Sequence, residues 1–185
     1  MTKAAHYPGK PAPAPARGRR AVLVGLIAAA LVAGCGRPPE TVRRAPPPQR
    51  DWAVVAPGDP AAANSVVIRA ISLVGTPYRY GGNSPEGGFD CSGLVNYVFR
   101  DMLDLGLPRT SRALAEYQGD RIDPARLAAA DLVFFGSRGS VTHVGIYVGQ
   151  GRFVHAPSSG GTVRLDHLDG AYWRDNYSGA RRVLR

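Results

Sequence analysis

Cysteine, lysine and long apolar runs are all scarce in this sequence. It has only two cysteines, Cys35 and Cys91, which allow at most one disulfide bond, and two lysines that both lie in the first ten residues. The N-terminal apolar run, residues 21–34, is fourteen residues long. Since a membrane-spanning helix needs ~20 apolar residues, this run is too short to cross a bilayer.

The N-terminus instead has the pattern of an export signal, because the apolar run follows residues 1–20, which carry five basic and no acidic side chains. The run ends in "VAGC", which resembles the lipobox of bacterial lipoproteins. This resemblance implies that residues 1–34 are removed and that Cys35 is lipidated. Gly36 after it implies sorting, in Gram-negative bacteria, to the outer membrane facing the periplasm. The alternative is an ordinary export signal cut near Ala33, which leaves Cys35 free.

Lipidation of Cys35 would leave Cys91 without a partner for an internal disulfide. Exported proteins usually pair their cysteines, so an unpaired one indicates an intermolecular disulfide or a reactive thiol. A buried, inert cysteine is the other interpretation, and the local sequence has to decide between them.

The charge of the chain excludes little. The mature chain carries 18 basic residues, all of them arginine, and 14 acidic residues, for a net charge of +4. This balance suits a protein that works near an anionic polymer. No basic patch alternates with aromatic residues, so we expect no nucleic-acid partner.

The chain divides into a linker and one domain. Residues 35–60 hold the cysteine proposed to carry lipid and seven prolines, which predicts an extended linker with a reach of roughly 75 Å at ~3.1 Å per residue. Trp52, within this linker, could dock on another part of the protein, but we expect it to be an exposed aromatic side chain. Apolar periodicity returns at residue 61 and continues to residue 185, which predicts a single domain of about 120 residues.

Helical patterns come first in this domain and strand patterns second. A helix is expected within residues 63–75, and a second one follows Asp90. A short third helix is expected to be capped by Thr110 or Ser111. Their expected buried residues are Val66, Val67, Ala70, Ile71 and Val74 in the first helix, and Leu94, Val95, Val98, Phe99 and Met102 in the second.

The period then changes to two in the segments "DLVFF", "VTHVGIYVG", "RFVHA" and "TVRLD". Residues 170–185 look like a short helical turn and a closing strand. Helices followed by an antiparallel sheet predict an α+β fold in which the N-terminal helices pack on the sheet.

Cys91 is expected in the first turn of the second helix, because Asp90 before it is a favoured N-cap residue. A helix N-terminus stabilises an anion by ~0.3–2 kcal/mol. A histidinium ~4 Å away contributes ~4 kcal/mol at an effective dielectric of ~20. A reactive thiol at this position therefore depends mainly on a nearby histidine.

Two of the three histidines of the domain, His143 and His155, lie on the strands of one predicted hairpin. A two-residue turn would put their rings on opposite faces of the sheet. A three-residue turn, residues 149–151, would pair Gly145 with His155 and make the two rings diagonal neighbours. We expect this longer turn, because a glycine stands at the position that needs a positive φ.

These residues can supply the chemistry that a reactive cysteine needs. A cysteine nucleophile requires a base within hydrogen-bond reach, and the base requires a third group that orients its ring. Cys91, His143 and His155 can fill these roles in that order. The third histidine, His167, has no comparable partner and is expected to be a solvated loop residue.

Six segments strengthen this interpretation: "GTPYRYGG", "GFDCSGLV", "LPRTS", "DLVFF", "HVGIYVGQGRFVHA" and "YW…Y…ARRVL". In this order they resemble the NlpC-type cell-wall cysteine peptidases, and most of all the Spr-type murein endopeptidases, which are single-domain lipoproteins. The resemblance implies a compact papain-like fold over residues 61–185.

The resemblance also implies a role for individual residues. It makes Cys91 the nucleophile, His143 the base, His155 the orienting residue, Tyr78 a stabiliser of the oxyanion, and Asp90 and Ser92 contacts for polar groups of the stem peptide. Asp90 could also be only a helix cap, and either Tyr78 or Tyr80 could be a core aromatic residue. Arg109 and Glu116 are assigned no role and could pair on the surface.

The implied function is that of a peptidoglycan endopeptidase, active as a monomer and without metal or cofactor, which cleaves murein stem peptides or crosslinks at meso-diaminopimelate. The Spr-like ending favours the D-alanyl crosslink over the γ-D-glutamyl bond. The rival interpretations are a non-catalytic peptidoglycan-binding lipoprotein, a thiol acyltransferase, and a metal site formed by Cys91, His143 and His155.

Overall fold

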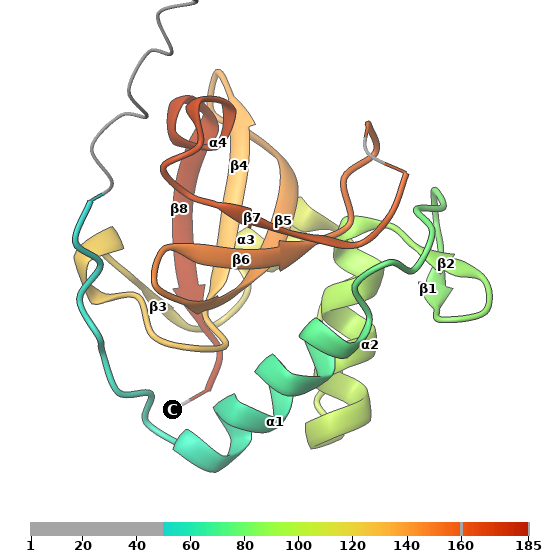
Figure 1. Cartoon of the computed structure of the whole chain (residues 1–185), viewed down its shortest axis with the longest axis horizontal. Coiled ribbons are helices and arrows are strands. Elements are labelled where there is room, and N and C mark those ends of the chain that lie inside the picture. The colour runs from blue at the N-terminus through green and yellow to red at the C-terminus, as the bar shows by residue number, and fades with distance from the viewer. Residues whose placement is uncertain (1–49, 160, 185) are drawn as a thin grey trace, which may run out of the picture. The chain divides into compact units, whose positions relative to one another are not determined.

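The structure is a computed structural model that describes residues 50–159 and 161–184 (Figure 1). The predicted export signal, Cys35 and the first part of the linker lie outside these residues. The helices of the described part are α1 (Pro60–Ser72), α2 (Cys91–Leu103), α3 (Ser111–Glu116), the 3-10 helix η1 (Pro124–Arg126) and α4 (Ala171–Asn176). Within this part, none of them has the length and apolar character needed to span a bilayer.

An antiparallel sheet of six strands, in the order β3-β8-β4-β5-β6-β7, carries the second half of the chain. A separate small hairpin, β1–β2, precedes α2 (Figure 1). The strands are β1 (Asn83–Ser84), β2 (Gly88–Phe89), β3 (Asp120–Arg121), β4 (Leu132–Ser137), β5 (Ser140–Gly149), β6 (Arg152–His155), β7 (Arg164–His167) and β8 (Tyr177–Arg182). Helices on an antiparallel sheet confirm the α+β fold expected from the sequence.

The sheet is apolar on both faces. Successive side chains of a strand point to opposite sides, and the apolar ones form a separate cluster on each side. Val144 and Ile146 of β5 belong to a core shared with α1 and α2, which pack against each other (Figure 1). Phe135 of β4 and Tyr147 of β5 belong to a second cluster that includes Trp173 of α4. Full burial of a large apolar side chain contributes ~1.5–3 kcal/mol, so both faces hold the sheet in place.

Helix α1 buries only part of the predicted stripe, since Val66 and Ala70 lie in the core as expected. Ile71 and Val74, which were expected in the core, are each 47% exposed, and Met102 of α2 is 36% exposed. The buried stripe of α1 continues instead through Leu73, and its members are Ala63, Val66, Ala70 and Leu73. Ala63 and Leu73 were not among the predicted residues.

Helix α2 begins at the predicted residue because Asp90 caps it. Asp90 Oδ1 accepts a hydrogen bond from the Gly93 N–H at 2.7 Å. A side chain at Gly93 would overlap the backbone carbonyl of Gly82, so only glycine allows the preceding loop to touch the helix here. The contact fixes the loop against the end of α2 that presents Cys91. Helix α3 begins at the predicted cap as well, since Thr110 accepts from the Ala113 N–H at 3.2 Å.

The β5–β6 hairpin places its histidines on the same face, as predicted. Tyr147 pairs with Phe153, and this register carried two residues further puts Gly145 opposite His155. A side chain at Gly145 would overlap the ring of Phe153, which explains why glycine separates the two histidine positions.

The turn of this hairpin differs from the predicted one. Gly149 pairs with Arg152, so the turn has two residues, Gln150 and Gly151, and the register shifts by one residue around Val148. Gly149, Gln150 and Gly151 all have positive φ, at 100°, 53° and 71°, as a tight hairpin turn next to a bulge requires. The three-residue turn was therefore wrong, and the bulge restores the register that this turn was expected to give.

Trp52 is not an exposed side chain of an extended linker. Its indole Nε1 donates to Asp169 Oδ2 at 2.9 Å, and its ring lies 6.2 Å from that of Tyr147. A side chain at Gly151 would overlap the indole, so the hairpin turn leaves room for it. The expectation was wrong because no local pattern reveals a contact between residues so far apart in the sequence.

Candidate active site

Cys91 is the first residue of α2, and its thiol is free and half-buried. Burial raises the pKa of Cys91; a backbone hydrogen bond from Val144 opposes this rise, and the charge of Asp90 adds to it. Val144 follows His143 on β5, so this hydrogen bond brings the sulfur to the strand that carries the histidine. Because its pKa is raised, the thiol is protonated at neutral pH and needs a base before it can act as a nucleophile.

A chain of hydrogen bonds begins at His143. Its Nε2 lies 2.9 Å from His155 Nδ1, and His155 Nε2 lies 3.0 Å from Asp166 Oδ2. The predicted contact between the two histidines is thus confirmed. The sequence did not reveal Asp166, which reaches His155 because β7 pairs with β6 so that Phe153 faces Asp166.

Asp166 decides which ring nitrogens carry a hydrogen. Burial acts to raise the pKa of Asp166, but His155 and Arg164 outweigh it, so the pKa is lowered and the group is ionised. A carboxylate can only accept hydrogen bonds, so a neutral His155 carries its hydrogen on Nε2 and accepts on Nδ1. His143 must then donate from Nε2, which leaves its Nδ1 as a free base.

Both imidazoles are neutral at physiological pH. Burial lowers the pKa of His143 from 6.5 to about 3, and the charges of His155 and Arg164 act in the same direction. Burial also lowers the pKa of His155 to about 4, although Asp166 opposes this. The resting site therefore differs from the thiolate and histidinium considered from the sequence, because burial disfavours the charged form of both groups.

Aromatic side chains enclose the two histidines. Trp173 stacks on His143 with ring centroids 5.5 Å apart, and its Nε1 donates to Asp166 Oδ2 at 2.9 Å. The ring of Phe153 lies 4.8 Å from that of His155, which is fully buried. Sequence reasoning assigned Trp173 no role at the site, although it lies in one of the family motifs.

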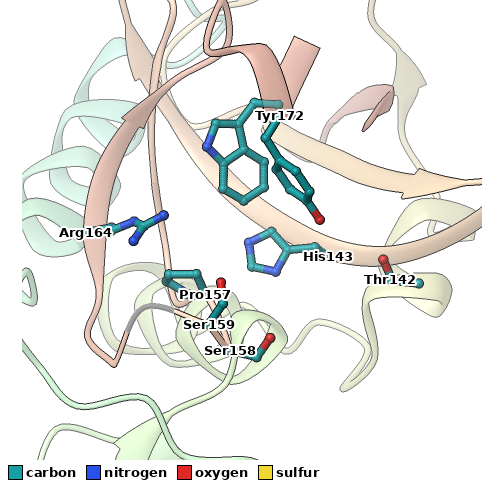
Figure 2. A pocket seen from close by; sticks show the side chains of 8 residues that line it. Thr142, His143, Pro157, Ser158, Ser159, Arg164 and Tyr172 are labelled. Atoms are coloured by element: carbon teal, nitrogen blue, oxygen red, sulfur yellow. The ribbon is translucent and has the colours of Figure 1, made fainter. Parts of the chain in front are cut away.

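A cavity of about 530 Å³ opens beside His143 (Figure 2). Tyr172, which is 67% exposed, stands at its edge, and the guanidinium of Arg164 points into it. The other lining residues are Thr142, Pro157, Ser158, Ser159 and Trp173. Arg164 Nε and Nη2 lie 3.1 and 3.0 Å from Asp166 Oδ2. This arginine is a second site residue that the sequence did not reveal.

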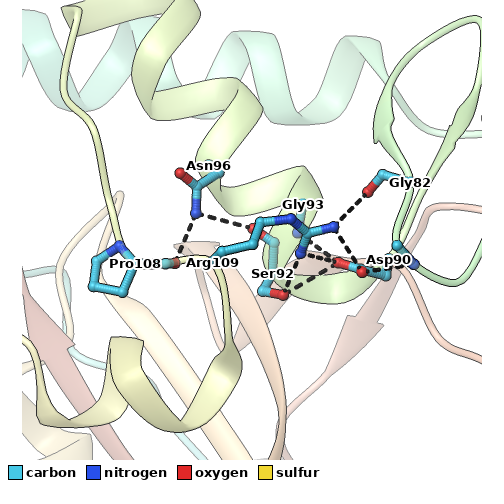
Figure 3. A network of polar contacts seen from close by, with 8 residues as sticks. Gly82, Asp90, Ser92, Gly93, Asn96, Pro108 and Arg109 are labelled. Atoms are coloured by element: carbon cyan, nitrogen blue, oxygen red, sulfur yellow. Dashed lines mark hydrogen bonds and ion pairs between the residues drawn. The ribbon is translucent and has the colours of Figure 1, made fainter.

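Arg109 joins Asp90 and Ser92 into a polar network at the start of α2 (Figure 3). Its Nη1 lies 2.8 Å from Asp90 Oδ1 and 2.8 Å from Ser92 Oγ, and its Nη2 lies 2.8 Å from Asp90 Oδ2. Burial alone would raise the pKa of Asp90, but Arg109 and the cap contact to Gly93 lower it. The suggestion that Arg109 could pair with Glu116 on the surface was therefore wrong.

The two tyrosines before α2 have different environments. Tyr78 is half-buried and packs against the same core as Cys91. Burial raises the pKa of Tyr78, and the charge of Asp90, like that of a thiolate at Cys91, acts in the same direction, so its hydroxyl keeps its hydrogen at neutral pH and can donate it. Tyr80 is 90% exposed, which rules it out as a core residue.

His167 lies apart from this site, and it is not a solvated loop residue. It ends β7, is half-buried, and its Nδ1 accepts from the Asp169 N–H at 3.2 Å. The expectation was wrong because no local pattern shows that Trp52 packs edge-on against this ring.

The geometry also bears on the metal site considered from the sequence. Both ring nitrogens of His155 are engaged, one by His143 and the other by Asp166. Neither is free to bind a cation. No group of three or more potential ligands with metal-binding geometry occurs among the described residues.

Comparison with known proteins gives consistent matches. The model of the NlpC/P60 family matches residues 75–182. The probable endopeptidase NlpC of Escherichia coli K12 is 40% identical over 166 residues, covering 85% of this chain and 96% of that protein. Murein DD-endopeptidase MepH of the same strain is 43% identical over 126 residues, covering 66% of this chain and 46% of that protein. The chain thus spans about half the length of MepH.

Among solved structures, the NlpC/p60 domain of the peptidoglycan hydrolase SagA superposes with a TM-score of 0.58 at 31% identity. The match covers 65% of this chain and 98% of the SagA domain.

The buried histidines make the stability of the fold depend on pH. An unfolded histidine binds a proton near pH 6.5, whereas His143 and His155 bind one only near pH 3 and 4. The unfolded state therefore binds more protons than the folded state below pH 6.5. As the pH drops below this value, the free energy of unfolding should fall by up to ~1.4 kcal/mol per pH unit for each histidine. Urea denaturation between pH 7 and pH 5 measures this loss.

Two variants test whether the buried pair is the cause. His155→Gln removes one of the two histidines and should reduce the slope of stability against pH by about half. His167→Gln, outside the pair, should keep the slope of the wild type. Equal slopes in all three proteins would contradict the assignment.

Proposed function

Because the chain belongs to the NlpC/P60 family, as its motifs predicted, we propose that it is a cysteine hydrolase that cleaves amide bonds of peptidoglycan stem peptides. The observation that carries the proposal is the hydrogen-bonded chain from Asp166 through His155 to His143. It ends in a free basic nitrogen on the strand that binds the Cys91 sulfur. The names of two similar proteins, a murein DD-endopeptidase and a peptidoglycan hydrolase, support the same class of substrate.

The first half of the reaction forms an acyl-enzyme. His143 Nδ1 takes the proton of the Cys91 thiol as the sulfur attacks the substrate carbonyl carbon, so that the charged pair arises only during the attack. The new imidazolium is stabilised through His155 by the carboxylate of Asp166. The oxyanion lies at the N-terminus of α2, where the backbone N–H of Cys91 and the hydroxyl of Tyr78 can donate to it.

The second half returns the enzyme to its resting state. The imidazolium of His143 gives its proton to the departing amine, and the carbon–nitrogen bond breaks to leave a thioester on Cys91. His143 then takes a proton from water, the hydroxide attacks the thioester, and the carboxylic acid product leaves. The thiol recovers its proton, so each cycle consumes one water molecule.

The network of Asp90, Ser92 and Arg109 supports substrate binding at the start of α2, next to the nucleophile in sequence. Asp90 is engaged by Arg109 and by the cap of α2, so its carboxylate is committed to the protein. We therefore propose that Asp90 acts by holding Arg109 and Ser92 in place. The Ser92 hydroxyl is buried and donates to Asp90 Oδ1 at 3.1 Å, so it supports Arg109, whose exposed guanidinium contacts an acidic stem peptide.

Replacement of the nucleophile should abolish cleavage without unfolding the protein. Cys91→Ser should lower the rate of muropeptide cleavage by about 10³-fold or more, as loss of a catalytic nucleophile usually does. Mass spectrometry of purified sacculi after digestion measures the products. Circular dichroism should show an unchanged fold.

The matched control is His167→Gln, which should digest sacculi at the rate of the wild type. Undiminished digestion by Cys91→Ser would refute the nucleophile assignment. Binding of sacculi by the wild type without soluble products would favour the non-catalytic interpretation instead.

The charge of Asp166 should matter for the rate as well. Asp166→Asn removes the charge that stabilises the imidazolium and permits the wrong ring tautomer, so kcat should fall by about 10- to 100-fold, as for the orienting partners of histidines in metal sites. Asp166→Glu keeps the charge and should retain more activity. Asp169→Asn is the control, because Asp169 is a nearby carboxylate that does not belong to the hydrogen-bonded chain of Asp166, His155 and His143. A kcat of Asp166→Asn equal to that of the control would contradict this role of Asp166.

We propose further that Cys35 carries lipid and holds a monomeric enzyme at the periplasmic face of the outer membrane. The sequence "VAGC" and the glycine after it support this location. A fatty-acid label should enter the wild type and Cys91→Ala but not Cys35→Ala, which tests the anchor by gel fluorescence. Labelling of Cys35→Ala would rule out this anchor.

A further inference from the structure

The cavity beside His143 is lined by a positively charged side chain, Arg164, which has no role in the reaction described above. Arg164 binds Asp166 through Nε and Nη2, and its Nη1 has no hydrogen-bond partner among the described residues. Its side chain is 42% exposed, and Figure 2 shows the guanidinium facing the cavity that His143 also lines. A planar guanidinium with a free edge suits the recognition of a carboxylate.

The position of this cavity indicates which part of the substrate enters it. His143 gives its proton to the departing amine, so the amine side of the scissile bond must lie next to His143. Arg109, in contrast, lines a separate cavity with Asn96 and Tyr97. The cavity with Arg164 is therefore the one placed to take the leaving group, because His143 lines it.

The two bonds that remained open differ in the charge next to the departing nitrogen. In a D-alanyl crosslink, the carbon of diaminopimelate that bears this nitrogen also bears a free carboxylate. In a γ-D-glutamyl bond, the corresponding carboxyl group is itself linked to the next residue, unless the stem peptide ends there. A cation placed to contact this group separates the two bonds by charge.

We propose that Arg164 binds the carboxylate on the carbon that bears the departing amine, and that it thereby selects the D-alanyl crosslink. This inference rests on the proposed function, since it assumes that the enzyme cleaves stem peptides. It makes Arg164 a specificity-determining residue on the leaving-group side, in addition to its contact with Asp166.

A purely structural role for Arg164 predicts something different. Asp166 also accepts hydrogen bonds from His155 and Trp173, so Arg164 could serve only to hold this carboxylate. In that case its loss would slow the cleavage of every substrate by the same factor. A role in specificity instead changes the ratio between two substrates.

The test uses two crosslinked muropeptides that differ only at this carboxylate, which is free in one and amidated in the other. The purified full chain should cleave the free form with a kcat/KM about 10- to 100-fold higher, the range expected for one charge-assisted contact. Arg164→Gln should bring this ratio close to one, and Arg164→Lys should keep an intermediate ratio. Because both rates are measured on the same protein, partial loss of folded enzyme cancels.

Arg152→Gln is the matched control, because Arg152 lies on β6 with its guanidinium bonded to Gln150 rather than to Asp166. It should keep the ratio of the wild type. A wild-type ratio near one, or a ratio that Arg164→Gln leaves unchanged, overturns the inference.

A binding measurement separates this inference from the proposed function. Calorimetry compares the affinity of the amine product, with its carboxylate free or amidated, for the wild type and for Arg164→Gln. Absence of cleavage by the wild type would contradict the proposed function, and the affinity ratio would still decide the role of Arg164. Preference of the wild type for the free carboxylate, lost in Arg164→Gln, supports the inference.

Discussion

The carboxylate of Asp166 is the contact on which the rest of the site depends. One of its oxygens, Oδ2, accepts hydrogen bonds from His155, Arg164 and Trp173, which come from three different elements of the fold. Strand β6, strand β7 and helix α4 are therefore joined at a single atom. Because a carboxylate cannot donate, the same atom also sets the orientation of two imidazole rings in succession.

The polar groups buried around this carboxylate have hydrogen-bond partners in the described part of the chain, whereas Nδ1 of His143 has none there. Burying a polar group is costly unless it is hydrogen-bonded, and both nitrogens of His155 as well as Nε2 of His143 have partners. Nδ1 of His143 is left as a base on the strand that binds the thiol. The incomplete end of the network is where chemistry is expected. The aromatic rings around the two histidines keep the imidazoles neutral until the sulfur attacks the substrate and its proton passes to His143.

The sequence predicted the local features of this structure well and the distant ones poorly. The cap at Asp90, the α+β order and the shared face of His143 and His155 are confirmed, because each depends on residues close in sequence or on strand periodicity. Arg109 and Asp166 were missed, because their partners are set by the path of a loop and by the pairing of β6 with β7. The β5–β6 hairpin shows how far such prediction reaches. The predicted turn was wrong, and His143 and His155 share a face only because a bulge compensates for the shorter turn.

The docking of Trp52 ties the last part of the predicted linker to the domain. The indole is held by Asp169 and fits over Gly151, so the residues from Arg50 onward move with the enzyme, and only residues 36–49 separate them from Cys35. Fully extended, these span at most ~50 Å, against the ~75 Å expected of a linker that ends at residue 60. Under the proposed anchor, the enzyme therefore works within a shallow layer of wall above the bilayer, and strands of murein beyond this depth lie out of its reach.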